Sequence, residues 1–382
     1  MAFEFATAGR IVFGRGCAAR IGEEAAQFGR RVFVLTGRRR ERWAFLWEDL
    51  RRRGMDCERF AIMHEPTVTI VEQAVQMAAS AGADVVIGIG GGSVIDAAKA
   101  VAAKLPNPGD LLHYLEVIGQ GRSLENPSLP CIAVPTTAGT GAEVTRNAVI
   151  ASPEKRVKVS LRHASMIPDL ALVDPELTLS APPEVTATAG LDALTQLIEP
   201  FVSLMANPLT DALCREGIPR AARALPAACA DGSDREARTD MCAASLLSGM
   251  ALANARLGAV HGIAGPFGGM FPGAPHGAVC ARLLPAVTAV NLRAMADRGL
   301  DSSRYAQVAR MLTGDASAGA ADAAAWLEEL CAGLAVPRLG SYGFSSADYR
   351  PLAERAARAS SMKGNPVRLS ADELREAFER AV

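Results

Sequence analysis

The chain has 382 residues, of which 49% are hydrophobic, 21% charged and 5% aromatic. This length exceeds one ordinary domain, and the composition excludes an intrinsically disordered chain, which would be less hydrophobic and more highly charged. The 40 basic and 41 acidic residues give a net charge of -1, which excludes the strongly basic surface of a dedicated nucleic-acid-binding protein. We therefore expect a two-domain globular protein that does not bind nucleic acid.

The eight cysteines are scattered along the chain and form no CxxC pair. They fit neither a disulfide framework nor a cysteine-based zinc site. The N-terminus lacks the charged and then apolar order of a signal peptide, and no run approaches the roughly 18 apolar residues of a spanning helix. We expect a cytoplasmic protein that does not bind a membrane.

The first half of the chain alternates short β-branched runs with segments of helical periodicity. This pattern is typical of parallel strands joined by crossover helices, so we predict a doubly wound parallel-sheet α/β domain. The predicted strands are Val32–Thr36, Cys57–Met63, Asp84–Gly88, Cys131–Pro135 and Ala171–Asp174, and the predicted helices between the first three are Glu41–Arg53 and Val68–Ala81.

The character of the sequence changes at Pro182-Pro183, beyond which alanine- and leucine-rich segments with few β-branched clusters favour helices. A double proline after a predicted strand cannot continue a helix and marks a break in the chain. We therefore divide the chain into an α/β domain over residues 1–183 and an all-α domain over residues 184–382.

A glycine run follows the third predicted strand and leads into Ser93 and a helical segment that contains Asp96. Glycine backbone can approach a ligand closely, and Ser93 is placed to cap a helix whose free N–H groups attract phosphate. We predict that Gly91, Gly92 and Ser93 bind a pyrophosphate. The alternative is a tight strand-to-helix turn without a ligand.

The loop after Cys131–Pro135 is dense in hydroxyl groups and small residues and contains Thr136, Thr137 and Thr140. Such a loop can hydrogen-bond a ribose or a carboxamide that lies close to the backbone. A plain polar turn is the alternative.

Four residues of the second half could form a metal site. Asp192 and Gln196 stand four apart and would share one face of a helix, and His261 and His276 follow in a glycine-rich stretch. One carboxylate and two imidazoles form a set that suits Fe²⁺ and is acceptable to Zn²⁺, with positions left for a substrate. Histidines with purely structural hydrogen bonds are the alternative.

The order and spacing of these motifs, with Pro168–Pro175 and the late Gly364-Asn365-Pro366, resemble the iron-containing (group III) alcohol dehydrogenase family over essentially the whole chain. The resemblance implies a dinucleotide-binding domain and a helical domain with a catalytic cleft between them, an architecture shared with dehydroquinate synthase. It implies an oxidoreductase that transfers a hydride between NAD(P)(H) and a small alcohol, aldehyde or ketone, as a homodimer or larger assembly.

The resemblance also implies roles for single residues. The substrate would react beside Asp192, His261 and His276, and these three residues with Gln196 would hold Fe²⁺ or Zn²⁺. The residues implied to bind the cofactor are Gly91, Gly92, Ser93, Thr136, Thr137, Thr140 and Lys158, and we also expect Gly37, Arg38 and Asp96 to contact it.

The chain departs from the family pattern at two positions of the helical domain. Where the family has a histidine ligand this chain has Gln196, whose amide oxygen is a weaker donor, so we expect lower metal affinity. Gly265 replaces a family histidine that is linked to proton transfer. We therefore expect water or a chain of ribose hydroxyls to deliver the proton.

A third departure concerns the choice of cofactor. After Val32–Thr36, NAD-preferring members of the family place an aspartate that hydrogen-bonds the ribose, whereas this chain has Gly37 followed by Arg38, Arg39 and Arg40. Arginines bind a 2′-phosphate well, so we predict a preference for NADP(H) over NAD(H). The alternative is that these arginines only solvate the start of a helix.

Three other functions remain open on the same scaffold. The first is a metal-free reductase resembling the maleylacetate reductases. The second is a lyase of the dehydroquinate synthase type, which would need more basic phosphate-binding residues than the sequence shows. The third is a protein that binds a dinucleotide without catalysis.

Overall fold

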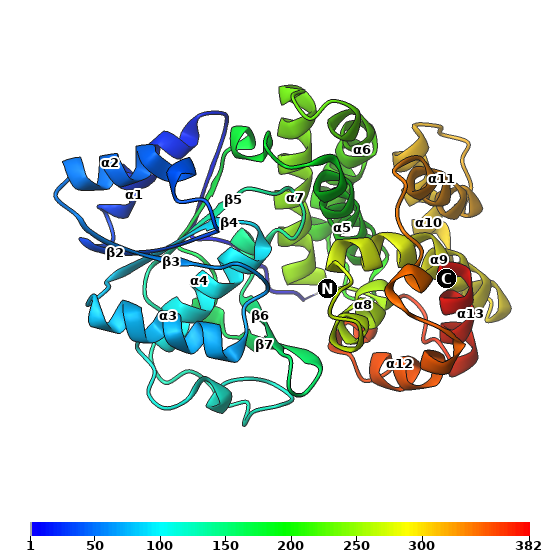
Figure 1. Cartoon of the computed structure of the whole chain (residues 1–382). Helices are drawn as coiled ribbons and strands as arrows, with labels where there is room; N and C mark the ends of the chain where they lie inside the picture. The colour runs from blue at the N-terminus through cyan, green and yellow to red at the C-terminus, as the bar shows by residue number, and fades with distance from the viewer. Residues whose placement is uncertain (1) are drawn as a thin grey trace. The chain divides into compact units, whose positions relative to one another are not determined.

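The computed structural model describes residues 2–382 and contains two compact units (Figure 1). The α/β unit comprises Thr7–Thr137 and Gly141–Leu179, and the helical unit comprises the residues up to Ala6, Ala138–Thr140 and Ser180–Val382. The predicted fold class, a parallel-sheet α/β domain followed by a helical domain, is confirmed.

The α/β unit is built on a six-stranded parallel sheet with the strand order β1-β8-β5-β4-β2-β3. A separate antiparallel hairpin is formed by β6 and β7. The strands are β1 (Arg10–Phe13), β2 (Arg31–Thr36), β3 (Asp56–Ala61), β4 (Val85–Gly90), β5 (Cys131–Pro135), β6 (Asn147–Ser152), β7 (Val157–Arg162) and β8 (Leu170–Val173), and the helices are α1 (Ile21–Ala25), α2 (Ala44–Arg52), α3 (Val68–Ser80) and α4 (Gly92–Lys104).

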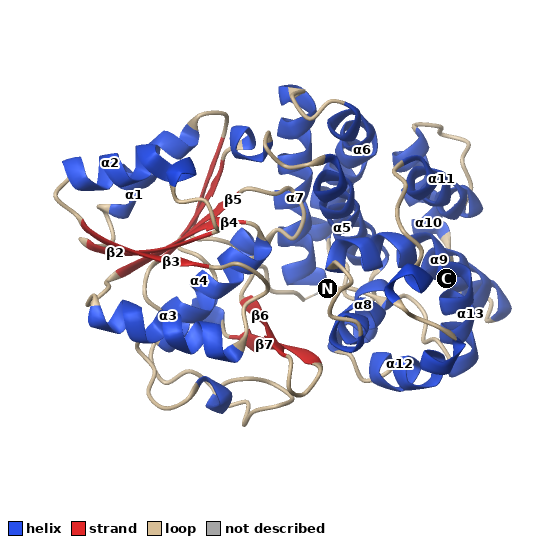
Figure 2. Ribbon diagram, in the orientation of Figure 1, coloured by secondary structure: helices blue, strands red, loops and turns tan. Residues whose placement is uncertain are grey.

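Strand β2 shows why this sequence forms a sheet that is covered on both faces. Successive side chains of a strand point to opposite faces. Val32 and Val34 pack in the cluster that contains α1 and α2, whereas Phe33 and Leu35 pack in the cluster that contains α3 and α4. Figure 2 shows the two pairs of helices on opposite faces of the sheet. A run of consecutive apolar residues is what such a doubly covered strand requires.

The structure corrects three details of the predicted elements. The predicted helix Glu41–Arg53 begins with a 3₁₀ turn over Glu41–Trp43 and becomes α-helical only from Ala44. Strand β3 ends at Ala61, two residues before the predicted end. The β6–β7 hairpin was not predicted, although its alternating buried residues, such as Ala148 and Ile150, were a readable signal.

The helical unit starts where the double proline stands. Pro182 is the N-cap of α5 and Pro183 its first residue, a position that proline favours because it needs no N–H partner. The helices are α5 (Pro183–Val202), α6 (Pro208–Ala230), α7 (Arg235–Ala255), α8 (Ala259–Met270), α9 (His276–Asp297), α10 (Ser303–Thr313), α11 (Ala320–Gly333), α12 (Tyr349–Ala356) and α13 (Ala371–Ala381).

Two short segments from the first half belong to the helical unit, whereas the predicted division at residue 183 is a single cut. The Asn254 side chain accepts a hydrogen bond from the Ala6 amide at 2.7 Å and donates to the Ala6 carbonyl at 2.9 Å. Gly139 lies so close to Ala189 that any side chain would collide with it. These local contacts explain why residues up to Ala6 and Ala138–Thr140 join the helices.

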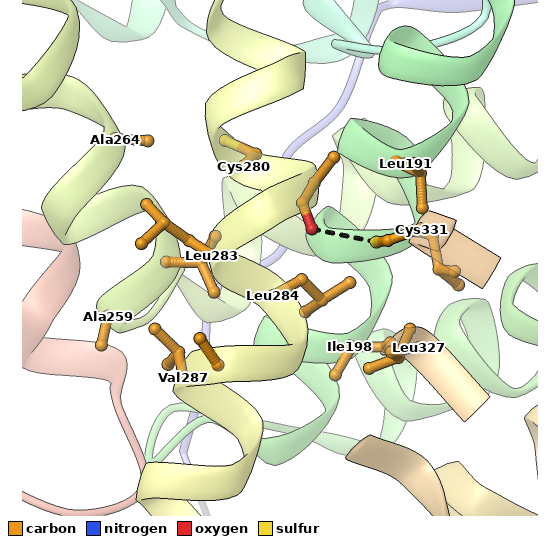
Figure 3. Close-up of a cluster of buried hydrophobic side chains, with 14 of the residues drawn as sticks. Leu191, Ile198, Ala259, Ala264, Cys280, Leu283, Leu284, Val287, Leu327 and Cys331 are labelled. Atoms are coloured by element: carbon orange, nitrogen blue, oxygen red, sulfur yellow. Dashed lines mark hydrogen bonds between the residues drawn. The ribbon is translucent and has the colours of Figure 1, made fainter. Parts of the chain in front are cut away.

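Helix α9 is the central helix of this unit. Its Leu283, Leu284 and Val287 pack with apolar side chains of α5, α8 and α11 in the cluster drawn in Figure 3. Among the described residues, α9 is long and apolar enough to cross a membrane by itself, but 83% of its apolar window is buried inside the unit. It is therefore placed as a core helix.

We predict that Glu373, at the start of α13, makes stability depend on pH. It accepts a hydrogen bond from Arg298 and forms a capping box with Ser370, and these contacts lower its pKa from 4.5 to about 2. Glu373→Gln should lower the free energy of unfolding by about 1–2 kcal/mol at pH 7. The difference should shrink as the pH falls below 4.5 toward 2, because the wild-type carboxylate then becomes protonated and loses its advantage.

Urea unfolding of both proteins between pH 7 and pH 3 measures this difference. Glu354→Gln is the matched control, because Glu354 pairs with Arg350 on an exposed face and should contribute less than about 0.5 kcal/mol. A difference between Glu373→Gln and wild type that stays constant with pH would contradict the prediction.

Candidate functional site

The glycine run connects β4 to α4 at the carboxyl edge of the sheet. The prediction that Ser93 caps this helix is wrong: Gly91 is the N-cap, and Ser93 lies in the first turn. The first bonds of the helix run from the Val94 and Ile95 amides to the Gly91 carbonyl. The amides of Gly92 and Ser93 precede these bonds and face the end of the helix, an arrangement that suits an anion such as pyrophosphate.

The threonine loop lies beside the glycine run, because β4 and β5 are parallel neighbours whose carboxyl ends meet. The Thr136 amide donates to the Gly90 carbonyl at 2.9 Å, and a side chain at Gly91 would contact the Thr137 hydroxyl. The structure thus brings Gly91, Gly92, Ser93, Thr136 and Thr137 together. Thr140 follows in the segment that belongs to the helical unit.

The end of β2 also lies at this edge. The chain runs from β2 outward to β3 and then returns to the other side of β2 to form β4, so the strand order reverses between β2 and β4. Ligands of open α/β sheets bind at such a reversal. Gly37 follows β2 here, and Arg59 fixes the turn by donating to the Gly37 carbonyl at 2.7 Å and to the Arg38 carbonyl at 3.2 Å.

Two other predicted cofactor residues are engaged with the protein itself. The Asp96 carboxylate accepts a hydrogen bond from the Val149 amide at 3.0 Å and pairs with Lys99 at 3.1 Å. Burial raises the pKa of Asp96, and Lys99 opposes this shift. Lys158 pairs with Glu65 at 2.6 Å. Contact of Asp96 or Lys158 with a cofactor stays a prediction.

The second cluster lies within the helical unit, where α5, α8 and α9 bring together residues that are far apart in sequence. Asp192 comes from α5, His261 from α8, and His276 and Cys280 from α9. One ligand atom from each of these four residues lies within 4.8 Å of the others. The sequence prediction for Asp192, His261 and His276 placed them in one site, and the structure brings them together. Cys280 was missed, although its position one turn after His276 was a signal.

Two buried atoms at the centre of this cluster have no hydrogen-bond partner among the residues that the structure describes. These atoms are Asp192 Oδ1 and His261 Nε2, which lie 3.4 Å apart. Buried polar atoms without partners cost free energy, so such a pair indicates a missing ligand. Two imidazoles and a carboxylate are donors that a divalent transition metal accepts, so the residues present fit the metal ion that the sequence predicted.

The neighbouring side chains orient these donors. Glu199 Oε2 lies 2.6 Å from His261 Nδ1, a contact that needs a proton on Nδ1, so Nε2 is the ring nitrogen that an ion would bind in place of a proton. Gln196 donates to Asp192 Oδ2 at 3.1 Å and accepts a hydrogen bond from Ser248 at 3.1 Å. Coordination of the metal by Gln196 itself stays a prediction.

The ionisable side chains of the cluster shift one another's pKa. Burial would raise the pKa of Asp192, but the adjacent His261 and His276 outweigh it and lower this pKa, so the carboxylate is ionised at neutral pH. Burial lowers the pKa of His261, but Cys280, Glu199 and Asp192 outweigh it and raise the pKa. A divalent ion at this place would therefore compete with a proton.

The start of α8 is built by residues that sequence reasoning did not single out for this role. Glu199 Oε1 accepts from the Val260 amide at 2.7 Å, and Asn365 Oδ1 accepts from the Ala259 amide at 3.0 Å. A side chain at Gly258 would collide with both acceptors. Glu199 therefore fixes the start of the helix and the His261 ring together, which places His261 in the cluster.

Comparisons with known proteins match nearly the whole chain. Residues 8–175 match the family model "Iron-containing alcohol dehydrogenase", and residues 186–382 match the model "Fe-containing alcohol dehydrogenase family, C-terminal". The chain belongs to the iron-containing alcohol dehydrogenase family. The predicted family is thus confirmed, and so are the enzyme class and the reaction class, NAD(P)-linked oxidoreduction of alcohols and aldehydes.

Several relatives support this membership. The long-chain-alcohol dehydrogenase 1 of Geobacillus thermodenitrificans is 36% identical over 87% of this chain and 84% of its own length. The 1,3-propanediol dehydrogenase of Citrobacter freundii is 35% identical over 87% of this chain and 85% of its own. A crystal structure of 1,3-propanediol oxidoreductase superimposes with a TM-score of 0.92 at 31% identity and covers both chains completely.

In this iron-containing alcohol dehydrogenase, Gly265 lies one turn after His261 within α8, and apart from the adjacent helix backbone no atom of residues 2–382 lies within 4 Å of the place that a methyl group would take. Gly265→Ala should therefore raise the free energy of unfolding by about 0.5–1 kcal/mol, because glycine loses more backbone freedom in a helix than alanine does. Urea unfolding measures this change. A destabilised variant would contradict the prediction and show that the position is crowded.

Gly265→His restores the histidine that the family uses for proton transfer, and Gly265→Ala serves as its control. If delivery of the proton limits the reaction, kcat should rise by about tenfold in the histidine variant and stay near the wild-type value in the alanine variant. An unchanged kcat and pH profile in the histidine variant would show that the relay was never limiting.

Proposed function

We propose that this enzyme transfers a hydride between NADP(H) and a small alcohol or its aldehyde or ketone, with a divalent metal ion held by Asp192, His261 and His276. The observation that carries the proposal is the convergence of two unpartnered buried donors, Asp192 Oδ1 and His261 Nε2, beside His276. The relatives named as alcohol and propanediol dehydrogenases support the class of substrate. A bound ion would polarise the substrate carbonyl and stabilise the alkoxide.

The helical unit orients the proposed metal ligands before an ion binds. Glu199 keeps the proton of His261 on Nδ1, and Gln196 holds Asp192 Oδ2, so that His261 Nε2 and Asp192 Oδ1 are presented toward each other. Burial of Asp192 and His261 excludes water from these atoms, which strengthens their electrostatic effect. Because Gly265 carries no side chain, water or ribose hydroxyls deliver the proton that aldehyde reduction needs.

The α/β unit binds the dinucleotide in our proposal. The first-turn amides of α4 at Gly92 and Ser93 receive the pyrophosphate, while the threonine loop leads toward the nicotinamide end. A sulfoacetaldehyde reductase from Bifidobacterium kashiwanohense, solved in complex with NAD⁺, superimposes on this chain with a TM-score of 0.88 at 26% identity. Its cofactor supports a nicotinamide dinucleotide here without deciding between the two forms.

We propose NADP(H) as the preferred form on the basis of the turn after β2. Gly37 offers no carboxylate to repel a 2′-phosphate, and the exposed Arg38, Arg39 and Arg40 follow it. Arg59 adds a further positive charge beside this turn. Planar guanidinium groups bind phosphate in a bidentate manner.

Catalytic efficiency with NADPH and NADH, measured on a panel of aldehydes and ketones, tests the proposed function. We expect oxidation of NADPH to be favoured, and Arg38→Ala should raise the KM for NADPH by about tenfold or more while leaving that for NADH nearly unchanged. Arg30→Ala is the control, because Arg30 is exposed just before the opposite end of β2. A clear preference of the wild type for NADH would refute the NADP proposal, and no cofactor oxidation with any substrate would refute the function.

We further propose a cytoplasmic homodimer or larger assembly. The relatives named as alcohol and propanediol dehydrogenases support a small-molecule substrate as its partner. Light scattering of the purified protein at several concentrations measures the assembly. A monomer at all concentrations would refute this part of the proposal.

A further inference from the structure

The candidate metal centre contains a donor that the family pattern did not lead us to expect. Cys280 lies on α9 one turn after His276, is fully buried, and has its sulfur 3.5 Å from His276 Nε2. Its sulfur also belongs to the group of ligand atoms that lie within 4.8 Å of one another. Cys280 therefore faces the place where the unpartnered atoms of Asp192 and His261 converge.

We propose that the Cys280 thiolate, and not the Gln196 amide, is the fourth metal ligand, and that this sulfur makes the site selective for zinc over iron. The inference rests on the proposed function, because it concerns the ion that the reaction would use. The proton of the thiol leaves to solvent when the ion binds.

The distances within the cluster agree with a tetrahedral set of ligands. Typical zinc–nitrogen, zinc–oxygen and zinc–sulfur bonds at a tetrahedral angle place neighbouring donor atoms roughly 3.4–3.6 Å apart. Asp192 Oδ1 lies 3.4 Å from His261 Nε2 and 3.9 Å from His276 Nε2, and Cys280 Sγ lies 3.5 Å from His276 Nε2. These three distances are near the liganded spacing, and the remaining donor atoms also lie within 4.8 Å of one another.

Gln196 has a different task in this arrangement. Its amide nitrogen donates to Asp192 Oδ2 and its oxygen accepts from Ser248, so both polar ends of the amide have protein partners. By holding Oδ2, Gln196 turns Oδ1 toward the other donors. Gln196 is then a positioning residue. The fourth donor, which a histidine supplies in the family, is here the sulfur of Cys280 on α9.

A second cysteine shows what a purely structural thiol looks like in this unit. Cys331 on α11 is as deeply buried as Cys280, but its thiol donates to the backbone carbonyl of Ala281 at 3.2 Å, the contact drawn in Figure 3. Cys280 instead contacts a histidine of the cluster. The two cysteines therefore form a matched pair for a test.

The ligand set determines which ion is favoured. Zn²⁺ generally binds nitrogen and oxygen donors more tightly than Fe²⁺, and a soft thiolate donor widens this difference in favour of zinc. A site with one thiolate, two imidazoles and one carboxylate should therefore retain Zn²⁺ when Fe²⁺ is offered in equal amount.

Co²⁺ binding to the metal-free full-length protein tests the inference without reference to activity. We expect a thiolate-to-cobalt charge-transfer band in wild type and in Cys331→Ser, and loss of this band in Cys280→Ser. Competition between equal amounts of Zn²⁺ and Fe²⁺ should load mainly Zn²⁺ into wild type. The affinity for Zn²⁺ should fall at least tenfold in Cys280→Ser, because replacing a ligand should cost no less than the roughly 10–100-fold lost with an outer-shell partner. The preference for Zn²⁺ over Fe²⁺ should fall as well, because the soft donor is gone.

If Cys280→Ser fails to fold, Gln196→Ala still tests the inference, because it removes the alternative fourth ligand and leaves Cys280 in place. This variant should keep the charge-transfer band and lose only part of its affinity, about 10–100-fold, as expected for an outer-shell partner. Cobalt bound by wild type without a thiolate band, or no cobalt bound at all, would overturn the inference. Hydride transfer is measured separately, so an active enzyme without the band would overturn the role of Cys280 and leave the proposed function standing.

Discussion

Asp192→Asn should lower kcat/KM for aldehyde reduction by about 10³-fold or more, because it removes the negative ligand of the proposed ion while keeping the shape of the side chain. Asp192 is 1% exposed and its Oδ1 is one of the two unpartnered atoms of the cluster. Steady-state kinetics together with metal analysis of the purified protein measure both effects. We expect the bound metal to be lost along with the activity.

Asp297→Asn is the matched control, since Asp297 ends the same helix that carries His276 but lies on an exposed face and pairs with Arg293. Its kinetics should equal those of wild type. Chelation of the wild-type enzyme should reproduce the loss, and added Zn²⁺ should restore the rate. Full activity in metal-free protein would instead favour a metal-free reductase of the kind that resembles the maleylacetate reductases.

Lys99→Met should destabilise the α/β unit by about 3 kcal/mol, because it leaves the half-buried carboxylate of Asp96 without its counter-charge. Lys99 is completely buried on α4, and its ammonium group donates to the Ala142 carbonyl at 2.9 Å and to the Thr145 hydroxyl at 3.0 Å. These acceptors would also lose their partner. Urea unfolding followed by circular dichroism measures the loss.

The same variant should weaken cofactor binding. Ala142 and Thr145 follow directly after the threonine loop, so Lys99 fixes the chain that leaves this loop. Lys104→Met is the matched control, because Lys104 is also buried on α4 but donates to a single carbonyl, that of Asn107, and should cost about 1 kcal/mol. Equal destabilisation by both variants would show that the contacts of Lys99 to Asp96 and the loop add no more to the free energy of unfolding than the hydrogen bond of Lys104.

Sequence reasoning located the glycine run and the threonine loop because both follow buried strands, and their proximity follows from the parallel order of β4 and β5. It failed on the capping of α4 because the strand continues to Gly90, two residues beyond its predicted end, which moves the cap to Gly91. Boundaries of this kind depend on the hydrogen bonds of neighbouring strands, which a local pattern does not contain.

By itself, the sequence determined the class of the fold and the type of the main elements other than the β6–β7 hairpin, because the spacing of apolar residues and the positions of glycine and proline act locally along the chain. It also predicted that Asp192, His261 and His276 form one group, since their order in the chain is that of the family. Only the tertiary structure decided which partners these residues have. Glu199 reaches His261 across 62 positions of sequence, and Cys280 joins the cluster because α9 packs against α5 and α8. Contacts of this kind are set by the packing of whole helices, so no local pattern along the chain reveals them.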